Sequence, residues 1–117
     1  MQSTSTTPNS TTDTNRNSKI HTWNRGIYTL ELEILSNGVK LWRTETNSFD
    51  ESVPVVRALN RDAYLASPED VRIQFGLIAS NYGSITVNEA REFSTKIEAA
   101  AKVAEEFTAI AAEWEDK

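Results

Sequence analysis

Cysteine is absent from the chain, and this absence sets the first limits on the class of protein. The 117 residues also include only four glycines, three prolines and one histidine. Without cysteine, neither a secreted disulfide scaffold nor a cysteine-type zinc module can form. No stretch approaches the roughly 18 apolar residues that a membrane-spanning helix requires, and no apolar signal segment follows Met1. We therefore expect a soluble, cytoplasmic protein.

Motifs for catalysis, metals and cofactors are also missing. The glycines are scattered and form neither GxGxxG nor GxxxxGK[ST]. His21 stands beside a polar tail, which is a poor place to hold a catalytic base rigidly. Glu31 and Glu33, like Glu105 and Glu106, fall in patterns typical of exposed positions, where general acids of raised pKa are not expected. The loop acids match no calcium loop. We predict no enzyme, no metal site and no cofactor.

The net charge of −5 at pH 7 disfavours general nucleic-acid binding, which needs a basic face to neutralise phosphates. A ligand- or nucleic-acid-binding sheet around Lys40, Trp42 and Arg72 is a distant alternative. The acidic balance is compatible with a basic protein partner, although it is also ordinary for solubility.

Residues 1–18 are almost entirely Ser, Thr, Asn and Asp, with no large apolar residue after Met1. Such a composition buries too little surface to offset the entropy of ordering. We predict a disordered tail over residues 1–22 and a single domain over residues 23–117, which is long enough for one modest core.

Two strands and a hairpin are predicted next. Residues 27–35 alternate apolar and polar side chains, which is typical of a half-buried strand. The dipeptide Asn37-Gly38 favours a two-residue turn into a second strand over residues 39–46. That turn would pair Glu33 with Trp42 and would place Trp42 on the face opposite the core.

Two further strands are predicted, and for the first of them an alternative stays open. Residues 53–59 are β-branched and apolar around Pro54, which suits an edge strand, but a short helix reaching Leu65 is an open alternative. Residues 60–70 are polar, with a turn at 67–70. Residues 71–79 alternate again. The fold class is therefore α+β, a small antiparallel sheet of about four strands packed by one long C-terminal helix.

The long helix is the clearest element. Apolar residues recur at 3-4 spacing from Ala90 to Trp114 and share one stripe. Thr86 and Glu89 form a capping box at its start, whereas acidic residues at its end oppose the helix dipole, so we expect the last turn to fray. A helix of about 29 residues is roughly 43 Å long, but a nine-residue strand spans about 30 Å. The helix should overhang the sheet, and we place the overhang at Phe107 to Trp114.

Three covers are possible for that overhang. The segment 20–23 folds over it, the loop 60–66 covers it, or another subunit does so in a homodimer.

The helix start also carries a resemblance. Residues 85–93 (ITVNEAREF), running into 97–101 (IEAAA), resemble the ending of many small actinobacterial and actinophage proteins of unknown function. This resemblance implies a small accessory protein of bacterial or phage origin and transfers no catalytic residue.

The sequence therefore predicts a non-enzymatic protein-interaction or structural accessory module. The alternative is a small acidic inhibitor or regulator of a larger enzyme or nucleic-acid-binding protein, which would use the acidic helix face. The predicted partner is a protein, either another protein or a second copy of this chain in a homodimer. Nucleic acid is not the expected partner, and no membrane is involved. The candidate contact residues are Trp42, Phe107, Ile110, Trp114, Glu98, Glu105 and Glu106.

Overall fold

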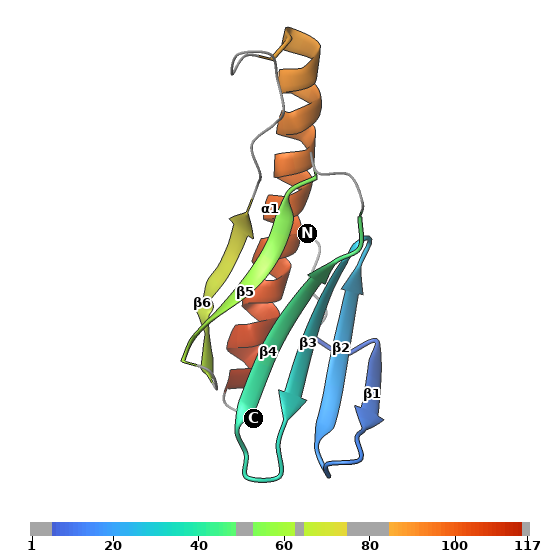
Figure 1. Ribbon diagram of the computed structural model, residues 1–117, viewed down its shortest axis with the longest axis vertical. Helices are drawn as coiled ribbons and strands as arrows, with labels where there is room; N and C mark the ends of the chain where they lie inside the picture. The colour runs from blue at the N-terminus through green and yellow to red at the C-terminus, as the bar shows by residue number, and fades with distance from the viewer. Residues whose placement is uncertain (1–5, 49–52, 63–64, 75–84, 116–117) are drawn as a thin grey trace.

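The computed structural model describes residues 6–48, 53–62, 65–74 and 85–115, and over these residues the fold is α+β, as predicted (Figure 1). Four strands form an antiparallel sheet in the order β1-β2-β3-β4, and two more form a separate antiparallel hairpin. The elements are β1 (Ser10–Asp13), β2 (Lys19–Arg25), β3 (Tyr28–Ile34), β4 (Lys40–Thr46), β5 (Val55–Asp62), β6 (Leu65–Gln74) and α1 (Val87–Glu115).

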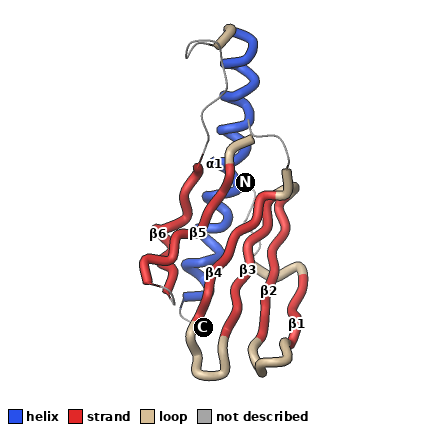
Figure 2. The backbone as a smooth tube through the Cα atoms, in the orientation of Figure 1, coloured by secondary structure: helices blue, strands red, loops and turns tan. Residues whose placement is uncertain are grey.

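Helix α1 lies against one face of the four-stranded sheet, and the β5–β6 hairpin flanks the helix on the side of β4 (Figure 1, Figure 2). Alternation along β3 selects this face, because Tyr28, Leu30 and Leu32 are buried while Thr29 and Glu31 lie on the opposite face. The Tyr28 hydroxyl donates a 2.7 Å hydrogen bond to the carbonyl of Pro54 and so ties β3 to the start of β5.

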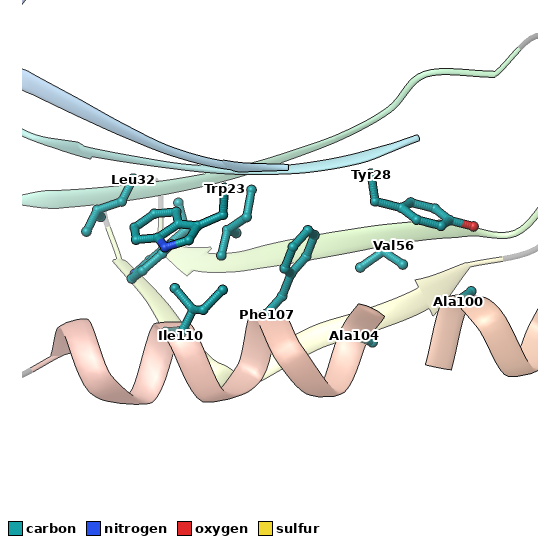
Figure 3. Packing of buried hydrophobic residues seen from close by; sticks show 11 residues of the cluster. Trp23, Tyr28, Leu32, Val56, Ala100, Ala104, Phe107 and Ile110 are labelled. Carbon is teal, nitrogen blue, oxygen red and sulfur yellow. The ribbon is translucent and has the colours of Figure 1, made fainter. Parts of the chain in front are cut away.

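The core fills the space between the sheet and the helix. Figure 3 shows Phe107 and Ile110 projecting from α1 toward the sheet, where Trp23 and Leu32 point back at the helix. Burying each large apolar side chain is worth about 1.5–3 kcal/mol, so this contact holds the two layers together. The other buried apolar residues are Tyr28, Leu30, Trp42, Val56, Ala100, Ala104 and Ala111.

The N-terminal segment corrects the prediction of a disordered tail over residues 1–22. β1 pairs with β2 through Ser10↔Thr22, Thr11↔His21, Thr12↔Ile20 and Asp13↔Lys19. The composition argument failed because it counts only apolar burial, whereas this polar segment is ordered by backbone pairing to the edge of an existing sheet. Residues 1–5 lie outside the described residues.

The hairpin between β3 and β4 corrects the predicted register by one residue. The Gly38 N–H donates to the Leu35 carbonyl and the Leu35 N–H to the Val39 carbonyl, and Gly38 has a φ of 87°. This is a three-residue loop with glycine in the left-handed region, so Leu32 and not Glu33 pairs with Trp42. A slip of one residue exchanges the faces of a strand, and Trp42 is therefore in the core.

The β5–β6 hairpin confirms a strand over residues 55–59 and excludes the helix alternative. The predicted turn at 67–70 is wrong, since Leu65–Gln74 is one strand that continues through Pro68. Register irregularities between Ala58 and Asp62 accompany this pairing, and proline is tolerated at such bulges and at edges. The predicted strand residues 75–79 lie outside the described residues.

The capping box of α1 is confirmed. The Glu89 N–H donates to Thr86 Oγ1 (3.1 Å) and the Thr86 N–H donates to Glu89 Oε1 (3.0 Å). Hydrogen bonding to the Thr86 backbone N–H, and then to the Thr86 side chain, lowers the pKa of the Glu89 carboxyl. The helix then runs without interruption to Glu115, so the expected fraying of the last turn is not observed over the described residues.

Candidate interaction surfaces

Three of the predicted contact residues belong to the core and offer no surface to a partner. Phe107 and Ile110 have no exposed area, and Trp42 is 2% exposed. The two helix residues point at the sheet because α1 turns its C-terminal half toward it, and Trp42 does so because of the shifted β-hairpin register. The interaction roles predicted for these three residues are corrected accordingly.

Trp114, half-buried at the end of α1, is covered by the chain itself. Its ring centroid lies 4.6 Å from that of His21 and 5.4 Å from that of Trp23, the latter in edge-to-face geometry. Both aromatic residues come from β2, so the first of the three predicted covers, the segment 20–23, is the one observed. Such aromatic pairs add about 0.5–1.5 kcal/mol beyond area burial.

A second part of the cover could not be predicted from composition. Trp23 Nε1 and Trp114 Nε1 both donate to the carbonyl of Thr6, at 2.9 and 3.0 Å. We call Thr6–Asp13 the N-terminal strap, because it joins β2 to the end of α1 at this point. Asn9 adds two bonds, from its N–H to the Thr22 carbonyl and from the Asn24 N–H to its Oδ1.

Lys40 completes the end of α1. Its Nζ donates to the carbonyls of Trp114 (2.7 Å) and Glu115 (2.6 Å). The last turn has no basic residue of its own, and terminal helix carbonyls need donors. The sheet therefore supplies the positive charge that the helix sequence lacks.

The overhang predicted for α1 exists, but at the opposite end from the predicted one. Figure 1 shows the N-terminal half of the helix extending past the strands. From Val87 to Ala99 the helix is exposed, apart from half-buried Phe93, Lys96 and Ile97. Val87 retains 68% of its accessible surface. The sheet thus engages the C-terminal half and leaves the N-terminal half as an outer surface.

The acidic candidates have separate environments. Glu98 and Glu105 are exposed on α1, whereas Glu106 is half-buried and lies 3.3 Å from Arg25 of β2 in an ion pair. Glu106 therefore contributes to the attachment of α1 to the sheet. Among the ten charged side chains of α1, seven are glutamates, and the three basic ones are Arg91, Lys96 and Lys102.

The opposite face of the sheet holds a polar network around Glu33, which is 7% exposed. Its carboxylate accepts hydrogen bonds from Ser18 Oγ (2.7 Å) and from Arg43 (2.9 Å), and Ser18 in turn bonds Thr14. The Ser18 bond first, and then the Arg43 bond, lower the pKa of Glu33. A carboxylate held ionised in this way acts as a structural acceptor.

His21 has its place fixed by neighbours on both sides. Nδ1 lies 2.8 Å from Thr11 Oγ1 in a hydrogen bond, and the ring packs on Trp114. Burial, and then the nearby Lys19 ammonium, lower the pKa of His21.

The described part of the chain has neither a metal-ligand cluster nor a helix that could span a membrane. Residues 6–48, 53–62, 65–74 and 85–115 contain no cluster of three His, Asp or Glu side chains placed to hold a metal ion. Within the same ranges, no helix has the length and apolar character needed to cross a bilayer.

Comparisons with known proteins found no matching family model, no matching curated protein and no matching solved structure. The resemblance of residues 85–101 to actinobacterial and actinophage proteins therefore stays a prediction.

Proposed function

We propose that this protein is a non-enzymatic interaction module that binds a basic protein surface through the exposed side of α1. The observation that carries this proposal is the separation of roles along the helix. Its C-terminal half holds the fold together through Phe107 and Ile110, while its N-terminal half extends beyond the strands as an exposed surface.

Charge supports a basic partner. The glutamates of α1 outnumber its basic residues by seven to three, so the helix carries most of the net charge of −5. Charge complementarity of this kind steers association and selects partners more than it adds affinity. It also favours the second candidate, a small acidic inhibitor or regulator of a larger enzyme or nucleic-acid-binding protein.

Buried Glu33 and half-buried His21 also favour an interaction role. Glu33 is engaged by Ser18 and Arg43 and has a lowered pKa, which is the opposite of the raised pKa that a general acid needs. His21 is covered by Trp114 and bonded to Thr11. Both side chains serve contacts inside the fold.

The test compares two charge-reversal variants of the full chain. The helix variant carries Glu98→Lys and Glu105→Lys, two exposed positions without a structural bond in the described residues. The matched control carries Glu31→Lys and Glu45→Lys on the outer face of the sheet and changes the net charge equally. Glu106 is left in place because it pairs with Arg25.

Each chain is immobilised, and the proteins retained from a bacterial extract are quantified at low and high salt. We expect a set of proteins that wild type and the control retain, that the helix variant loses, and that high salt releases. Equal retention by the helix variant and the control would refute the role of α1.

A purified retained protein then separates the two candidates. An acidic inhibitor lowers the activity of that protein in proportion to occupancy, whereas an accessory module binds it without changing its turnover.

A further inference from the structure

We infer that the edge of β2 beneath the N-terminal strap is a docking site for an extended peptide strand of another protein, with an apolar residue where the strap has Thr11. This surface is separate from the helix face proposed above, and either proposal can fail without the other.

The strap is held to the rest of the fold mainly by hydrogen bonds. Its β1 residues, Ser10–Asp13, are all exposed, and the strap contains no large apolar side chain. Thr6 and Pro8 are half-buried and the other six strap residues are exposed, so hydrogen bonds must supply most of what offsets the entropy of ordering eight residues. Intramolecular hydrogen bonds contribute only modestly because water competes for the same groups. Segments with few apolar contacts and exposed backbone bonds open first in native proteins. The strap meets both conditions.

Release of the strap would leave several hydrogen-bonding groups of β2 and α1 without their partners. Backbone groups of β2 at Thr22 and Asn24 lose their partners on Asn9. The indole N–H groups of Trp23 and Trp114 both lose the Thr6 carbonyl. The result is a strand edge with two convergent donors at one end, which is the arrangement that binds an added strand.

The position of Thr11 would set the side-chain preference for an added strand. Thr11 pairs with His21, whose ring packs on Trp114. A side chain at the Thr11 position therefore lies on the helix-facing side of the sheet, beside the His21 ring. Thr11 itself is exposed and bonds His21, and the His21 and Trp114 rings are only half-buried, so a larger side chain at this position has uncovered aromatic surface to pack on. An isoleucine in an incoming strand would bury apolar surface there, which gives a foreign strand an advantage over the strap.

The experiment adds labelled peptides to the full-length protein and measures binding by fluorescence polarisation. The first peptide has the sequence of residues 5–14, STTPNSTTDT, and the second carries isoleucine in place of its Thr11 residue. Because of competition with the strap, the apparent Kd equals the intrinsic Kd divided by the fraction of molecules whose strap is open. A variant that opens the strap should therefore bind both peptides more tightly.

Thr12→Pro is that variant. The Thr14 N–H donates to the Ser18 carbonyl, and the two-residue alternation of antiparallel ladders then directs the Thr12 N–H to Ile20. Proline removes this donor. Asp13→Pro is the matched control, because alternation turns the Asp13 N–H away from β2.

We expect Thr12→Pro to bind the first peptide at least tenfold more tightly than Asp13→Pro, and the isoleucine peptide to bind more tightly than the first. Equal affinities of the two variants, or of the two peptides, would overturn the inference. A wild-type dimer in light scattering that the isoleucine peptide fails to dissociate would assign the edge to strand exchange between copies and would also overturn it.

Hydrogen exchange of the wild-type chain gives a test that needs no variant. The amides of Ser10 and Thr12 should exchange at least tenfold faster than those that join β2 to β3. If the two sets exchange at the same rate, the strap opens only with the whole fold and the site does not exist separately.

Discussion

Replacing Lys40 with methionine removes the ammonium group that binds the last carbonyls of α1 while keeping most of the aliphatic stem. In the native fold, Lys40 Nζ donates to Trp114 and Glu115 at 2.7 and 2.6 Å. The two carbonyls would have to turn to water. We expect a loss of stability, concentrated at the C-terminal end of the helix.

The size of the loss follows from the geometry. A hydrogen bond from a charged donor contributes about 1.5–3 kcal/mol when buried, and a cation at a helix C-terminus about 0.3–1 kcal/mol. Lys40 is half-buried and the Glu115 carbonyl bond is exposed, so solvent screens part of both contributions. We expect about 1.5 kcal/mol, which at about 4–8 °C per kcal/mol for small domains lowers Tm by roughly 6–12 °C.

Circular dichroism at 222 nm is sensitive to helix content, and small domains usually unfold in roughly two-state transitions. Thermal unfolding followed at this wavelength therefore measures the difference in stability between the variant and the wild type. Lys102→Met is the control, because Lys102 is exposed on the same helix and an exposed i,i+4 pair on a helix is worth about 0.5 kcal/mol at most. If Lys40→Met costs no more than Lys102→Met, the sheet does not stabilise the helix end and the reasoning is wrong.

Three further predictions concern the core, the aromatic cover and pH. Trp42→Ala should lower the free energy of unfolding by about 3–5 kcal/mol in urea titration; a cost below 1 kcal/mol would place Trp42 on the outer face after all. Trp114→Glu should destabilise the monomer and leave its mass in light scattering unchanged, because β2 and the strap cover this residue; a wild-type dimer lost in the variant would show a subunit interface instead. The lowered pKa values of Glu33 and His21 mean that each group binds fewer protons folded than unfolded. The stabilisation that each group contributes is therefore complete above its ordinary pKa, which is 4.5 for Glu33 and 6.5 for His21, and is lost as the pH falls below that value. In Glu33→Gln the free energy of unfolding should fall less steeply as the pH is lowered into the acid range. An unchanged pH dependence would contradict the stabilising role of the ionised Glu33 carboxylate.

Local physics explains what could be predicted from the residues. The capping box at Thr86 and Glu89 needs only neighbours three positions apart, and the alternation of Tyr28, Leu30 and Leu32 needs only one buried face. The α+β class and the long helix follow from such patterns.

The candidate site was predicted less well, because its residues depend on strand register and on how distant elements pack together. The type of the β3–β4 loop moved Trp42 from the outer face to the core by a single residue. The direction in which α1 lies on the sheet decided that Phe107 and Ile110 are buried while Val87 is exposed. Periodicity identifies the stripe on a helix, but it does not say which half of the stripe meets the sheet.

The amino-acid sequence by itself determined the elements: a capped 29-residue helix, alternating strands, and a polar N-terminus with no large apolar side chain after Met1. Only the tertiary structure decided that this N-terminus is a strap, because its order comes from the edge of β2 and from two indoles that share the Thr6 carbonyl. It likewise decided that Lys40, 74 residues away along the chain, caps the helix at Trp114. Hydrogen bonds between residues far apart in the chain carry no periodic signature, so their partners become known only when the chain has folded.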